Sequence, residues 1–276
     1  MNMKVRKNNN EIVDFDISKL TSALMRTGAT NENIQKIISE IEPQLYDGIT
    51  TKKIYKIAFS VLRKKSKKLS AHYSLKNALL EFGPTGYPFE VFVGKLLKMQ
   101  GYNTEVGIII QGKCVTHEVD VVAINKNTKI YVECKFHQKK GHKNDVKIPL
   151  YINSRFHDIK NNLSNLPENK DYKFKGMIVT NTRFSGDAID FGRCAGLQLI
   201  SWDYPKGNCL RDWIDQANFH PVTSLSSANR DAKKKMLSNG IVICKDVVKN
   251  SNKLVNIGIN EKLAKKIIKE AKEIIQ

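Results

Sequence analysis

The stretch HEVDVVAINKNTKIYVECKFHQ, from His117 to Gln138, predicts two neighbouring β-strands. Both strands are rich in β-branched residues, and the polar segment 125–128 between them is typical of a hairpin connection. Asp120, Glu133 and Lys135 lie within these apolar strands, where a charge is costly to desolvate. A metal-dependent attack on a phosphodiester would explain two acids and a lysine in such a place.

The hairpin is expected to bring Asp120 and Glu133 together as ligands of one hard cation, Mg²⁺ or Mn²⁺, because such ions prefer oxygen ligands. Lys135 is two residues beyond Glu133, so the period of a strand places both side chains on one face. Its ammonium would then touch the attacking water or the scissile phosphate. Glu90 lies on the otherwise apolar face of an upstream helix, and we expect it to point at the same metal cluster.

The segments around the hairpin predict one mixed sheet flanked by helices. Apolar residues at helical spacing in FEVFVGKLLKMQG predict a helix over residues 89–101. Three strands should follow, and then a helix, a strand, a helix and a strand, at 149–164, 175–181, 185–196 and 197–203. This α-β-β-β-α-β-α-β order is typical of a mixed sheet with helices on its faces.

Glu90, Asp120 and the pair Glu133-x-Lys135 resemble, in their order and element types, the PD-(D/E)xK nuclease superfamily. Within it, GYPFEVFVGKLLKMQGY and VECKFH are most similar to the Mrr-type restriction endonuclease and archaeal Holliday junction resolvase branch, over residues 83–205. Val119 stands where the nominal motif has proline. The resemblance implies metal-dependent phosphodiester cleavage, in which Lys135 orients the water or offsets developing charge. A surface hairpin with ordinary charges is the simpler alternative.

Residues 1–82 predict a separate, mostly helical domain that opens with a β-hairpin over 3–16, because the three asparagines 8–10 tolerate a tight turn. Helices are expected at 17–28, at 31–45, from Thr50 or Thr51 onward, and at 69–82. The two glycines and two prolines of FGPTGYP, residues 82–88, then mark a domain boundary.

This opening, together with Tyr46-Asp47-Gly48-Ile49, resembles the ATP-cone, the small regulatory nucleotide-binding domain of ribonucleotide reductases and their transcriptional repressor. The resemblance implies that ATP or dATP binds between the hairpin and the first helix. By position, the nucleotide-binding residues are Val5, Arg6, Lys7, Asn8, Lys19 and Thr51. Asn8 replaces a usual second basic residue and Asn10 the usual turn glycine, so the preference between ATP and dATP stays open. A helical domain whose lysines are only solvated is the alternative.

The C-terminal part is expected to be a loop-like linker over 206–229 and a basic helical domain over 230–276. The latter has 12 basic and 5 acidic residues, which favours a polyanion. Its apolar-Gly-apolar turns resemble helix-hairpin-helix DNA-binding modules, in which backbone amides approach a phosphate. The resemblance implies DNA contacts at Gly258, Lys262 and Lys265. A merely solvated lysine-rich face is the alternative.

Composition points to the same class of partner. The 276 residues include 46 Lys and Arg against 27 Asp and Glu, a net charge of +19 that favours nucleic acid. The five cysteines are scattered and form no CxxC pair, so reduced thiols are expected. Neither a long apolar run nor a secretory leader is visible, so we expect a cytoplasmic protein without a membrane span.

The sequence therefore predicts a multidomain α/β and α+β protein that is a Mg²⁺-dependent DNA endonuclease responsive to ATP or dATP. ATP would regulate and not drive the reaction, because GIIIQGKC at 107–114 ends in Cys114 where a phosphate loop needs a hydroxyl. Nucleotide binding could set a homo-oligomeric state and so pair two active sites. The alternative is a catalytically inactive, nucleotide-sensing DNA-binding regulator.

Overall fold

The computed structural model describes residues 3–7 and 9–276. The N-terminal part is mostly helical, as expected, with a small three-stranded sheet in the order β2-β1-β3. Its elements are β1 Lys4–Arg6, β2 Ile12–Asp14, α1 Ile17–Met25, α2 Asn31–Ile41, η1 Glu42–Gln44, β3 Ile49–Thr50, α3 Thr51–Lys65 and α4 Lys67–Leu80. Asn10 has a φ of 64°, so an asparagine does adopt the left-handed turn conformation. The cap of α3 is Thr50, whose side chain accepts from the amide of Lys53.

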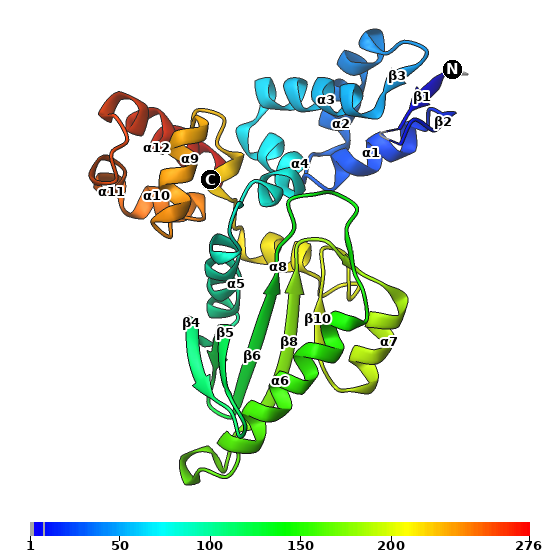
Figure 1. The fold of residues 1–276 in the computed structure, drawn as a ribbon. Helices are drawn as coiled ribbons and strands as arrows, with labels where there is room; N and C mark the ends of the chain where they lie inside the picture. The colour runs from blue at the N-terminus through cyan, green and yellow to red at the C-terminus, as the bar shows by residue number, and fades with distance from the viewer. Residues whose placement is uncertain (1–2, 8) are drawn as a thin grey trace.

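The central part is the predicted mixed sheet, and its element order is confirmed (Figure 1). Strands lie in the order β10-β8-β6-β5-β4, with β4, β5 and β6 antiparallel and β6, β8 and β10 parallel. The elements are α5 Tyr87–Met99, β4 Asn103–Gln111, β5 Thr116–Ile124, β6 Thr128–Lys135, β7 Lys143–Asn144, α6 Lys147–Leu163, η2 Pro167–Asn169, β8 Lys173–Thr180, β9 Arg183–Phe184, α7 Gly186–Cys194 and β10 Gln198–Ile200. Helix α5 packs on one face of the sheet, and α6 and α7 pack on the other.

The expectation of a loop-like linker at 206–229 is wrong. This segment forms α8 Leu210–Ala217 and the short helix η3 Val222–Ser224. Leu210, Trp213 and Ile214 are buried in the same core as α5, which makes the segment part of the central fold. Burial of that apolar face stabilises a helix too short to persist alone.

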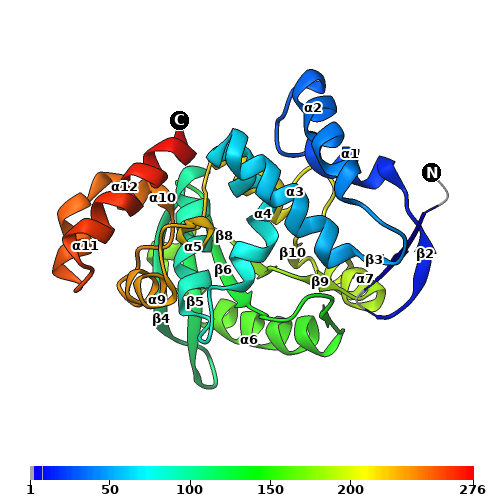
Figure 2. The ribbon, with the colours of Figure 1, turned by 90° about the horizontal axis from the view of Figure 1, so that it is seen from above.

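The C-terminal part is helical, as expected, and consists of α9 Arg230–Ser238, α10 Cys244–Lys249, α11 Ser251–Asn256 and α12 Glu261–Ile275. It lies beside α5, on the side away from α1 and α2 (Figure 2). One apolar core runs from α4 through α5 and the sheet to α12, so the three parts share buried surface. None of the described helices combines the length and the hydrophobicity needed to cross a bilayer.

Candidate active site and nucleotide cavity

The acids predicted for catalysis lie where β5 and β6 part. The antiparallel ladder ends with Val121 paired to Val132, so the same register sets Asp120 opposite Glu133. On the other side of β5, Asp120 is opposite Gly107, whose φ of 68° is left-handed. Glycine adopts such a φ without strain, and the β4–β5 pairing is interrupted at this position. The Asp120 carboxylate reaches β6, where it accepts from the amide of Cys134 at 2.6 Å.

Glu133 and Lys135 share one face of β6, as strand periodicity predicted. The Lys135 ammonium lies 2.6 Å from Oε1 of Glu133. The second carboxylate oxygen, Oε2, is 2.8 Å from the guanidinium of Arg155 on α6. Arg155 also donates to the backbone carbonyl of Glu118. Glu133 is nearly buried, so these two cations offset a charge that would otherwise be costly.

Glu90 lies in the first turn of α5, close enough to the acids of the strands for their charges to affect its pKa. Burial, followed by the charges of Asp120, Glu118 and Glu133, raises the pKa of Glu90 to about 7. Burial and the charge of Glu133 raise the pKa of Asp120 to about 6, against the opposing effects of the Cys134 amide, Lys135 and Arg155. The fold therefore brings Glu90, Asp120 and Glu133 into one neighbourhood, where they repel one another.

The predicted three-carboxylate metal centre is not assembled in this conformation. Over residues 3–7 and 9–276, no three His, Cys, Asp or Glu side chains lie close enough together to share a cation. The physical reason is that Glu133 is turned toward Lys135 and Arg155. The donor chemistry nevertheless fits a hard cation, since the acids offer only oxygen ligands, and a cation would offset the burial and the mutual repulsion that raise the pKa values of Glu90 and Asp120.

The predicted nucleotide-binding residues surround a cavity of about 200 Å³ between the N-terminal hairpin, α1 and α3. Val5, Lys7, Lys19 and Thr51 line it. The ammonium of Lys7 is 3.1 Å from Glu11, and that of Lys19 is 3.6 Å from Asp16. These exposed ion pairs are weak, so a polyphosphate could displace them.

Arg6 and Asn8 were also predicted to bind the nucleotide. Arg6 is exposed and is not among the described residues that line the cavity. Side chains alternate along β1, so Arg6 lies on the opposite face of the strand from Val5. Asn8 lies outside the described residues. Sequence reasoning missed Tyr55 and Tyr73, whose rings stack at 4.9 Å and form an apolar wall suited to a base.

The C-terminal turn does not offer the predicted backbone amides to DNA. The amides of Gly258 and Ile259 donate to carbonyls of Val255 and Leu254 and so close α11. The Gly258 carbonyl accepts from the ammonium of Lys235 at 2.9 Å. Of the two predicted lysines, Lys262 is exposed, and Lys265 pairs with Glu261 at 2.7 Å.

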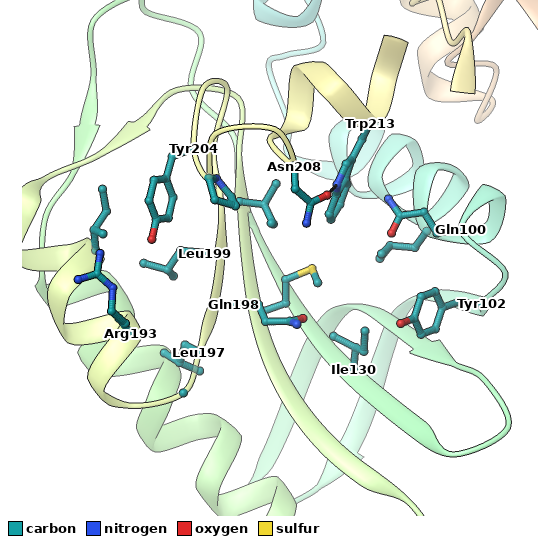
Figure 3. Close-up of a pocket in the computed structure, with 16 residues that line it drawn as sticks. Gln100, Tyr102, Ile130, Arg193, Leu197, Gln198, Leu199, Tyr204, Asn208 and Trp213 are labelled. Carbon is teal, nitrogen blue, oxygen red and sulfur yellow. Dashed lines mark hydrogen bonds between the residues drawn. The ribbon is translucent and has the colours of Figure 1, made fainter. Parts of the chain in front are cut away.

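Another cavity, of about 490 Å³, lies between α5, α7, α8 and β10 (Figure 3). Tyr102, Ile130, Leu199 and Trp213 give it a largely apolar lining, and Arg193 is the one charged side chain among the residues around it. The Trp213 indole donates to Asn208 at 2.6 Å. Since it contains none of the predicted catalytic residues, this cavity is separate from the acidic site.

Three family models match successive parts of the chain. They are described as ATP cone domain over residues 3–77, restriction endonuclease over residues 84–149, and AF1548-like, C-terminal, over residues 220–275. An uncharacterised protein of Archaeoglobus fulgidus is 32% identical over 184 residues, which is 66% of this chain and 99% of that protein. A crystal structure of a protein of unknown function, AF1548, has a TM-score of 0.60 at 31% identity and covers 69% of this chain and 98% of its own. The resemblances to an ATP-cone and a restriction endonuclease are confirmed.

Proposed function

We propose that this chain, which belongs to the AF1548-like family, is a Mg²⁺- or Mn²⁺-dependent DNA endonuclease regulated by ATP or dATP at its N-terminal cone. The observation that supports the proposal is that Glu90, Asp120 and Glu133-x-Lys135 lie in one neighbourhood, near the point where β5 and β6 part, although Glu133 is turned toward Lys135 and Arg155. These residues belong to a chain that carries a restriction endonuclease domain.

Asp120 and Glu133 would hold the cation, and Glu90 would complete its surroundings from α5. The cation would polarise the phosphate and lower the pKa of a water bound to it. Burial and the neighbouring acids raise the pKa of Glu90 to about 7 in the metal-free protein, and a cation held by these acids would lower it, so that Glu90 is ionised when the site is filled. Lys135 would orient the water or stabilise the charge that develops on the phosphate.

The contacts of Glu133 indicate how the site could change from the present conformation to an active one. Glu133 now accepts from both Lys135 and Arg155. A cation near Asp120 would compete for the same carboxylate oxygens, since it neutralises the charge that the two basic side chains now offset. Lys135 would then be free to face the phosphate, so loading of the cation and positioning of the lysine would occur together.

Regulation by a nucleotide has a short physical route. Tyr55, which lines the nucleotide cavity, lies under the ammonium of Lys140 at 5.7 Å from the ring centroid. Lys140 follows Lys135 by five residues in the connection that leaves β6. A base that moves the Tyr55 ring would therefore shift a segment attached directly to the catalytic lysine.

Supercoiled plasmid and branched DNA, incubated with Mg²⁺ or Mn²⁺, test the proposal. We expect nicking by the wild-type chain, loss of nicking in Asp120→Ala and Lys135→Ala, and retention in Asp171→Asn, which changes an exposed acid outside the site. Glu133 is now paired with the basic side chains of Lys135 and Arg155, and a carboxylate held in this way does not ligate a metal ion. An inactive nucleotide-sensing DNA-binding regulator is therefore the second candidate. Binding of DNA without cleavage under every divalent metal would favour that regulator.

The link to oligomeric state is tested separately. Size-exclusion chromatography and nicking rates are followed together across titrations with ATP and with dATP. We expect at least one nucleotide to change the rate, and a change in assembly would indicate that two active sites are paired. A rate and a size that stay constant across both titrations would remove nucleotide regulation from the proposal.

A further inference from the structure

A cavity of about 370 Å³ lies between the cone and the catalytic core. Helices α3 and α4 supply Tyr55, Tyr73 and Lys76, and the core supplies Arg183, Trp202 and Arg211. Because both parts contribute to the wall, the cavity exists only while they are docked. Its size is within the range of small-molecule sites, which run from about 300 to 1,000 Å³.

The cations around this cavity are only partly compensated. Arg183 pairs with Asp203 at 2.6 Å, and Arg211 lies 3.5 Å from Asp212. Lys76 has no carboxylate partner among the described residues, although its ammonium lies 5.3 Å from the centroid of the Trp202 ring. Burial, followed by the charge of Arg183, lowers the pKa of Lys76.

Two acids face these cations, and one of them, Asp203, is already paired with Arg183. Asp215 also lines the cavity, and burial raises its pKa to about 6. Its nearest basic contact is the His72 ring at 3.8 Å. The cavity therefore keeps an excess of positive charge, and an anion entering it would offset the cost of holding these cations near one another.

The cavity lies at the same edge of the sheet as the acidic site. Strands β6, β8 and β10 are parallel, so their carboxyl ends share one edge. Glu133 and Lys135 lie at the end of β6, Arg183 follows β8, and Trp202 follows β10. Ligands of open α/β sheets bind at this edge, because loops there diverge and leave room.

The aromatic side chains favour a nucleotide over a simple anion. The stacked rings of Tyr55 and Tyr73 form the boundary that this cavity shares with the nucleotide cavity of the cone. The Trp202 indole lines the cavity from the core side. Flat apolar rings beside basic side chains are how proteins hold unpaired nucleotides, with bases stacked and phosphates paired.

We propose that this interdomain cavity binds a nucleotide of an unpaired DNA strand, with its phosphate at Lys76 and Arg211 and its base against the aromatic rings. The proposal rests on the proposed nuclease function, and it specifies the substrate class as DNA that has an unpaired stretch. A DNA strand is favoured over a free nucleotide because the cavity shares the catalytic edge, and because the cone has a separate cavity for a free nucleotide.

Fluorescence anisotropy of a labelled oligothymidylate, with the full chain in EDTA, tests the proposal without requiring cleavage. The variant Lys76→Gln with Arg211→Gln should bind about ten-fold more weakly, and its salt slope should fall by about 0.7, since the two side chains hold one phosphate and each single-strand phosphate contact contributes about 0.7. The control Lys126→Gln with Lys173→Gln removes the same charge from exposed lysines at the opposite edge of the sheet. It should leave both quantities close to wild type.

Two further comparisons make the result specific. Lys76→Arg keeps the charge and should keep the affinity, and a blunt duplex should bind the double variant and the wild type equally. Unchanged ATP affinity and thermal midpoint would show that the double variant is folded. Equal behaviour of the two double variants on oligothymidylate would overturn the proposal, as would a loss confined to ATP binding. Absence of plasmid nicking would sink the nuclease proposal but leave this binding result intact.

Discussion

Replacing Asp120 by asparagine should stabilise the metal-free protein at neutral and alkaline pH. The pKa of Asp120 is raised from 3.8 to about 6, so the folded state holds the proton more tightly than the unfolded chain does. Ionisation therefore opposes folding, and the cost grows as pH rises from about 4 to 6. Two pKa units correspond to about 3 kcal/mol. Coupling to Glu133 and residual solvent screening reduce the expected gain from Asp120→Asn to about 2 kcal/mol above pH 6.

Urea unfolding in EDTA at pH 4 and at pH 8 measures this gain. Asparagine keeps an oxygen that can accept from the Cys134 amide, so the comparison isolates the charge. We expect Asp120→Asn to exceed the wild type at pH 8 and to match it at pH 4. Asp171→Asn, at an exposed acid, should change neither value. A variant that is no more stable than the wild type at pH 8 would refute the reasoning that ionisation of the buried Asp120 carboxylate, beside Glu133, opposes folding.

Three other substitutions test separate contacts. Arg155→Gln should cost about 2 kcal/mol in urea unfolding, because Glu133 loses a partner while nearly buried, and added Mg²⁺ should recover part of the loss by replacing the guanidinium. Lys140→Ala should leave the calorimetric ATP affinity unchanged but abolish the effect of ATP on nicking, because its contact with Tyr55 is lost. Lys19→Gln should weaken ATP binding about ten-fold by calorimetry, since it removes one point charge from the cavity.

Most of the fold could be predicted because hydrophobic periodicity is a local property. The hairpin around Asn125–Thr128 and the helices α5 and α6 follow from the spacing of apolar residues. Helix α8 was missed although Leu210, Trp213, Ile214 and Ala217 have helical spacing. It is eight residues long, and only burial against α5 stabilises so short a helix, which local sequence does not reveal.

The site was only partly predictable, because its details depend on contacts between distant elements. The pairing of Glu133 with Lys135 follows from strand period. The interruption of the β4–β5 pairing beside Asp120 falls at Gly107 in the neighbouring strand, and the role of Arg155 depends on where α6 packs after the crossover. The sequence did contain a sign of this role. Arg155 lies between Ile152 and Ile159, on the face of an amphipathic helix that packs on the sheet, and a cation on such a face needs an acidic partner.

Binding of Mn²⁺ to the full chain, followed by the electron paramagnetic resonance signal of the free ion, tests the central claim most directly. The claim is that the acids of α5, β5 and β6 hold one divalent cation. The account predicts a site that is present in the wild type and in Asp171→Asn, and that is lost in Asp120→Asn, which remains folded. Equal Mn²⁺ binding by all three proteins, or none by the wild type, would contradict it.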